Sequence, residues 1–198
     1  MTTISEQEFL AGLASKGLTL NPIYPQSKSL TYGAGSESRF WIVPPRAAER
    51  PYFLSALVSL LGEWQSCYAW RPHGSWPDRK TIDADRIGEL VELNIMAGLG
   101  APPGSIDVLR FSRDERDSLV TLMFATSIFG WSVGEDLYVV PDNASAFIMV
   151  SHHEDVHATT ARGGNIDHWV NSMAEAGYDL PANPPDATFK RPKWMPPG

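Results

Sequence analysis

The sequence predicts one α+β domain over residues 1–180, in which a mainly antiparallel sheet of roughly five to seven strands packs against about five helices. The chain has 198 residues, 43% of them hydrophobic, which is enough for one core. Short apolar runs typical of strands alternate with helical patterns. Strand-like runs between residues 131 and 160 are separated by short turns, which favours antiparallel pairing. Two subdomains divided within 101–104 (Ala-Pro-Pro-Gly) are the alternative.

The first elements follow from capping and breaking residues. Ser5 can cap a helix that runs to about Lys16 and ends at Gly17. Residues 18–37 are rich in Pro, Ser and Gly, and we expect a loop there. The β-branched and aromatic run 39–43 predicts a strand that ends at two prolines.

The middle of the chain predicts a second helix and two strands. Pro51 suits the first turn of a helix, and the apolar residues that follow it indicate a deeply packed one. A strand is expected over 66–71; it contains Cys67, the only cysteine, which we interpret as an inert core residue without a disulfide partner. A helix over about 85–98 and a strand over 106–111 follow.

A capping box and a long apolar run predict the central core helix. Ser112 and Glu115 have the spacing of a capping box, and the helix behind them is expected to end at Gly130. Residues 131–133 and 137–140 have strand-like composition, and the charged residues between them suit a turn.

The last third predicts a hairpin and a final helix. A strand over 146–150 can pair with one over 156–160. Asn165 can cap a helix that ends at Gly177. Six prolines in residues 181–198 predict an extended strap, which Phe189 and Trp194 would anchor to the body.

Composition excludes several classes of function. The formal charge of −7 argues against nucleic-acid binding, because phosphate recognition needs clustered Lys and Arg. No window reaches the roughly 20 apolar residues of a membrane span, and the N-terminus lacks the pattern of a secretory signal. We therefore expect a cytoplasmic protein. No phosphate-binding loop and no nucleophile elbow are present, so the sequence predicts no cofactor.

One motif carries chemistry. His153-Glu154-Asp155-Val156-His157 fits the pattern His-Glu-x-x-His and, over these five residues, resembles the signature of zincin metalloproteases. The resemblance implies that both imidazoles bind Zn²⁺ from one helix face and that Glu154 acts as general base.

The context of this motif favours a turn. The preceding residues 146–150 are β-branched and aromatic, and two glycines follow at 163 and 164, where a third ligand would be expected. We therefore interpret residues 152–155 as a polar turn between two strands. His157 and Thr159 would then point to one face of the sheet, opposite to their neighbours.

The leading hypothesis is a non-enzymatic protein-binding module whose partner has a basic surface. Small bacterial immunity proteins, which neutralise a cognate toxin, share this general profile of an acidic and compact chain. One alternative is a zinc-dependent hydrolase that uses His153, Glu154 and His157, and another is a structural or scaffold module that docks through the Pro-rich tail. Loop aromatics and charged turn residues are the candidates for partner binding: Trp76, Glu135, Asp136, His152, His153, Glu154 and Asp155.

Overall fold

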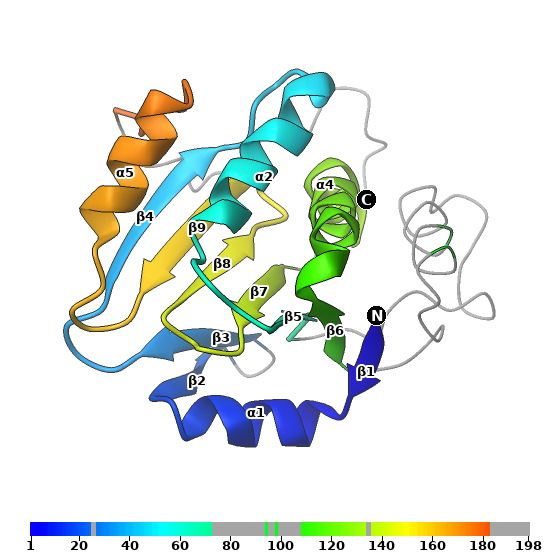
Figure 1. The fold of residues 1–198 in the computed structure, drawn as a ribbon, viewed down its shortest axis with the longest axis vertical. Helices are drawn as coiled ribbons and strands as arrows, with labels where there is room; N and C mark the ends of the chain where they lie inside the picture. The colour runs from blue at the N-terminus through cyan, green and yellow to red at the C-terminus, as the bar shows by residue number, and fades with distance from the viewer. Residues whose placement is uncertain (25–26, 73–93, 95–97, 99–107, 134–135, 183–198) are drawn as a thin grey trace.

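The computed structural model describes residues 1–24, 27–72, 94, 98, 108–133 and 136–182 (Figure 1). Within these ranges the protein is α+β, with a seven-stranded sheet, a separate two-stranded sheet and four α-helices. The predicted class and the antiparallel sheet are confirmed, while the helix count differs from the expected five. The helix predicted over about 85–98 lies almost wholly outside the described residues, and so does the predicted strap, from residue 183 onward.

The strands and helices have the following bounds. The strands are β1 (Thr2–Ile4), β2 (Leu18–Tyr24), β3 (Ser27–Tyr32), β4 (Glu37–Ile42), β5 (Ser66–Trp70), β6 (Val108–Ser112), β7 (Leu137–Pro141), β8 (Ala146–Val150) and β9 (Asp155–Thr160). The helices are α1 (Glu6–Ala14), α2 (Arg50–Ser59), α4 (Arg116–Val133) and α5 (Ile166–Glu175).

The large sheet has the strand order β1-β6-β5-β7-β8-β9-β4, and each described pairing is antiparallel. Helices α2, α4 and α5 pack on one face, where the larger hydrophobic core lies (Figure 1). Helix α1 and the β2–β3 hairpin pack on the other face and form a second core with β5 to β8. Strand β4 forms one edge of the sheet, and β1 forms the other.

The predicted caps are present. Ser5 Oγ accepts from the backbone N–H of Glu8 at 3.2 Å, and Asn165 Oδ1 accepts from that of His168 at 3.0 Å. The capping box joins the backbone N–H of Ser112 to Glu115 Oε2 at 2.8 Å. Several elements form close to where the sequence predicts them. They are helices α1 and α5, strands β4 to β7, and the hairpin strands β8 and β9.

The predicted loop over 18–37 is wrong. Residues 18–32 form the hairpin β2–β3, and residue 37 begins β4. Leu18, Leu30 and Tyr32 are buried, and they alternate with polar neighbours in the period-two pattern of a half-buried strand. Among the described strands, β2 and β3 pair only with each other, so both are edge strands, in which Pro22 is tolerated.

The predicted strand over 131–133 is also wrong, because α4 continues past Gly130 to Val133. Glycine inside a helix costs only about 1 kcal/mol relative to alanine, so a long helix can absorb it. None of the helices in the described ranges has both the length and the apolar character needed to cross a membrane.

Candidate functional site

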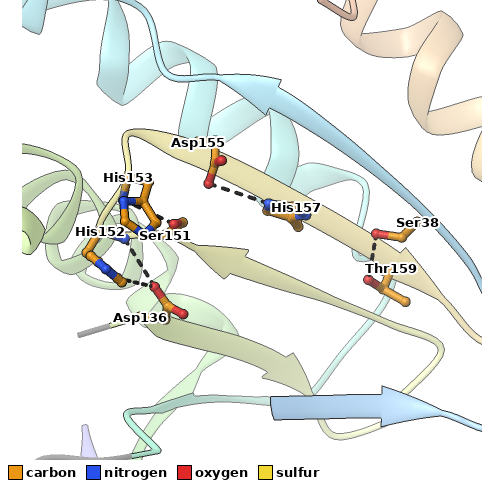
Figure 2. Close-up of polar contacts among 8 residues, drawn as sticks. All are labelled: Ser38, Asp136, Ser151, His152, His153, Asp155, His157 and Thr159. Atoms are coloured by element: carbon orange, nitrogen blue, oxygen red, sulfur yellow. Dashed lines mark hydrogen bonds and ion pairs between the residues drawn. The ribbon is translucent and has the colours of Figure 1, made fainter. Parts of the chain in front are cut away.

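The His-Glu-x-x-His motif lies in the turn between β8 and β9 and in the first residues of β9 (Figure 2). The backbone N–H of Ser151 donates to Asp155 O at 2.9 Å and closes the turn, in which Glu154 has a φ of 64°. The predicted turn is therefore confirmed. The single helix that would carry both imidazoles of a zincin site is not formed by these residues.

Metal binding has little geometric support in the described part of the chain. There, no group of three or more His, Cys, Asp or Glu side chains is arranged to hold a metal ion. His153 is exposed in the turn, whereas His157 lies in β9.

We expect His153→Ala to change the free energy of unfolding by less than about 0.5 kcal/mol, as for most surface substitutions. Urea unfolding of the wild type and of His153→Ala, with and without added Zn²⁺, measures this change. If Zn²⁺ strongly stabilised the wild type and His153→Ala abolished that effect, the interpretation of 152–155 as a turn without a metal site would be contradicted.

Asp136 anchors the first half of the turn. It directly precedes β7, and its Oδ1 accepts from the backbone N–H of His152 at 3.1 Å and lies 2.8 Å from His152 Nδ1 (Figure 2). The ring of His152 lies against that of His153 in a tilted arrangement, with centroids 3.9 Å apart. The side chains of Asp136 and His152 each remain 28% exposed. This pair therefore presents both an acidic and a titratable group at the surface.

Asp155 anchors the second half of the turn. Its Oδ1 lies 3.4 Å from His157 Nε2, which makes an ion pair when His157 is protonated (Figure 2). The distance is too long for a good hydrogen bond, and no described residue donates one to this oxygen. Burial of Asp155 raises its pKa, but His157, the Ser151 hydroxyl and His153 together outweigh burial and hold the pKa below its ordinary value.

This shift predicts a pH dependence of stability. Because the pKa of Asp155 is lower in the folded chain, its contribution is complete above the ordinary value of about 4 and is lost as the pH falls through the folded value. We expect Asp155→Asn to cost about 1–2 kcal/mol at pH 6 and progressively less below pH 4. Urea unfolding of both proteins across this range is the measurement. A cost that stays constant down to pH 2 would contradict it.

Arg50, in the first turn of α2, holds the turn against the helical layer. This side chain is buried; its Nε donates to Pro44 O at 2.9 Å, and Nη1 donates to Ser127 O. Nη2 reaches Glu154 Oε1 at 3.5 Å. The backbone N–H of Val43 also donates to Glu154 O at 3.0 Å. These contacts fix the turn relative to α2, α4 and the end of β4.

Beside the turn, one part of the sheet has no covering element among the described residues. We call it the open face: Ser38, Phe40 and Ile42 of β4 with His157 and Thr159 of β9. It lies opposite to Trp41, which is buried in the larger core. Ser38 and Thr159 join their hydroxyls at 3.1 Å, and the rings of Phe40 and His157 have centroids 5.8 Å apart. Ile42 is 47% exposed, which is unusual for a large aliphatic residue in a sheet.

The structure brings five of the predicted binding residues together in what we call the turn cluster: Asp136, His152, His153, Glu154 and Asp155. The other two, Trp76 and Glu135, lie outside the described residues. Cys67 is buried as predicted, and burial raises the pKa of its thiol, which supports an inert role.

Sequence reasoning missed Arg50 and the open face. Arg50 stands in the first turn of a helix, where the helix dipole disfavours a cation. A cation at this unfavourable position could have indicated that the side chain has specific partners elsewhere in the fold. No pattern in the sequence indicates that the side chains of Phe40 and Ile42 are accessible, because their exposure depends on which strand forms the edge of the sheet.

Comparison with protein-family models, with curated proteins and with solved structures finds no match to this chain. The function must therefore be argued from the turn cluster and the open face themselves.

Proposed function

We propose that this protein is a non-enzymatic module that binds a partner protein with a basic surface, in the manner of an immunity protein that neutralises a toxin. The turn cluster and the adjacent open face form the proposed contact surface. The observation that supports this proposal is that an exposed acidic residue lies beside an exposed apolar one: Glu154 is 60% exposed, and its carbonyl accepts from the N–H of Val43, the residue after Ile42, which is 47% exposed.

The turn cluster supplies the electrostatic part of the surface. Three carboxylates lie in or against the turn: Glu154 is 60% exposed and Asp136, which precedes β7, is 28% exposed, whereas Asp155 is buried. A carboxylate has about four acceptor positions, so its contacts with Arg50 or a histidine leave room for an arginine or lysine from a partner. The chain's net charge of −7 would add long-range attraction to a cationic partner.

The open face supplies the apolar part. Ile42 is exposed and Phe40 is half-buried, next to polar groups on β9. Protein interfaces commonly place apolar side chains at the centre and polar ones around them. The open face and the turn cluster have this arrangement over neighbouring residues, which favours protein binding over a zinc-dependent hydrolase built on the same histidines.

The experiment uses neutralising variants of the turn cluster. The tagged protein is used to recover a partner from the source cells, and the purified partner is then titrated calorimetrically with the wild type and with Asp136→Asn/Glu154→Gln. We expect the double variant to bind at least tenfold more weakly, because two charged contacts are lost. Asp155 is left unchanged, since its replacement is expected to affect stability.

The matched control removes two charges elsewhere. Glu63→Gln/Asp117→Asn neutralises two exposed residues near Ser66 and Ser112, at the opposite end of the strands from the turn cluster. This control is expected to bind within about threefold of the wild type. Equal losses in both variants, or recovery of no specific partner, would contradict the proposed function.

A further inference from the structure

Backbone hydrogen bonds show which groups of β4 face the outer edge of the sheet. The N–H of Val43 donates to Glu154 O at 3.0 Å, in the same register that pairs β4 with β9. Hydrogen-bonded pairs alternate along an antiparallel ladder, so the odd-numbered residues of β4 turn their N–H and C=O toward β9. The even-numbered residues, Ser38, Phe40 and Ile42, direct theirs to the outer edge.

The other side of β9 gives the same assignment. The N–H of Ser151 donates to Asp155 O at 2.9 Å, and that of Ala161 donates to Ser145 O at 3.0 Å. Both bonds follow the register of β8 with β9. The odd-numbered residues of β9 therefore bond to β8 and the even-numbered ones to β4, as the first assignment requires.

Along the second half of β4, no strand in the described part of the chain pairs with its outer edge. At the first half, Ser38 O accepts from Arg39 Nη1 at 2.9 Å. Within the described ranges, no hydrogen bond reaches the backbone of Phe40 or Ile42. Helix α5 contacts β4 but belongs to the core on the Trp41 face. Unused backbone donors and acceptors at a sheet edge are a template for another strand.

The charged side chains near the outer edge of β4 indicate which kind of strand would bind along it. At the first half of β4, Glu37 and Arg39 lie 3.9 Å apart and offset each other. Near the second half lie two carboxylates: that of Glu154 in the turn is 60% exposed, and that of Asp155, the register partner of Ile42, is buried. Cationic side chains are favoured beside these carboxylates, whereas a second copy of this chain would bring another charge of −7.

We propose that the partner adds an extended, lysine- or arginine-bearing segment as a further strand along β4, pairing with the backbone of Phe40 and Ile42. Its cationic side chains lie on the open face and reach toward Glu154, so the residues between them project to the opposite face of the sheet. This inference rests on the proposed function and deepens it, because it names the mode of recognition and the segment of the partner that is recognised.

The test uses a defined peptide and two substitutions at one position. The probe is a fluorescein-labelled peptide of alternating residues, (Lys-Val)4-Lys, and the matched probe is (Glu-Val)4-Glu; binding is followed by fluorescence anisotropy. Ile42→Pro removes the edge-facing N–H and leaves the bonds to β9 intact, since proline is tolerated on edge strands. Ile42→Ala removes the side chain and keeps the N–H.

Strand addition predicts a specific order of affinities. The wild type should bind the lysine peptide at least tenfold more tightly than the glutamate peptide. Ile42→Pro should weaken this binding at least tenfold, whereas Ile42→Ala should weaken it less than threefold. No detectable binding of the lysine peptide, or equal effects of the two substitutions, would overturn the inference.

Amide hydrogen exchange of the wild type tests the same claim without a variant and decides the matter if Ile42→Pro does not fold. The amides of Phe40 and Ile42 should exchange rapidly in the free protein and be protected by the lysine peptide. Protection without peptide, in a dimer that forms with rising concentration, would overturn the inference in favour of self-pairing. If partner binding depends on Asp136 and Glu154 while these amides stay unprotected in the complex, strand addition fails and the proposed function stands.

Discussion

Trp41→Ala is expected to lower the free energy of unfolding by about 3–5 kcal/mol, the usual cost of truncating a buried aromatic residue. The indole is 1% exposed and lies in the larger core, where α5 packs over β4. Removing it leaves a cavity between the edge strand and the helical layer. Urea unfolding followed by far-UV circular dichroism measures the change.

The neighbouring residue provides the control for this prediction. Ile42→Ala should cost less than about 1 kcal/mol, because Ile42 points to the opposite face and is 47% exposed. Costs of similar size at the two positions would contradict the assignment of faces on β4.

Arg50→Met is expected to cost about 2–3 kcal/mol. Methionine keeps much of the length and apolar bulk of arginine but removes the donors to Pro44 O, Ser127 O and Glu154. The carbonyl of Pro44 then loses its partner in a buried setting, and buried unpaired polar groups are costly. The turn cluster also loses its link to α2, so partner affinity should fall together with stability. Thermal and urea unfolding, with the titration of the recovered partner, measure both effects.

Arg46→Met is the matched control for Arg50→Met. The side chain of Arg46 is 81% exposed and pairs with Glu49 at 3.2 Å, an ion pair that contributes little because water screens it. We expect a change within about 0.5 kcal/mol and unchanged partner affinity. A cost for Arg50→Met no larger than this would show that Arg50 does not hold the turn.

Local signals were enough to predict much of the fold. Ser5, Ser112 and Asn165 each mark a helix start through a side chain that accepts a backbone N–H, and such contacts depend only on near neighbours. Composition misled where tertiary packing decides. The segment 18–37 is rich in turn residues, yet Leu18 and Tyr32 pack onto the sheet and make a hairpin favourable.

In the candidate site, too, local sequence predicts some features and tertiary contacts decide the others. The turn at His152 to Asp155 could be predicted because strand signals flank it on both sides. The approach of Asp136 to His152 and of Arg50 to Glu154 depends on contacts 16 and 104 residues apart in the chain. The place of β4 at the edge of the described sheet depends on the order of all seven strands, which no local pattern encodes.

The most direct test of the central claim is a hydrogen-exchange footprint of the complex between this protein and its recovered partner. We expect slowed exchange at residues 151–155 and at Phe40 and Ile42, with no change near Glu63 and Asp117. Protection confined to the region of Glu63 and Asp117, with the turn cluster and the open face unaffected, would contradict the claim that these two surfaces form the binding site.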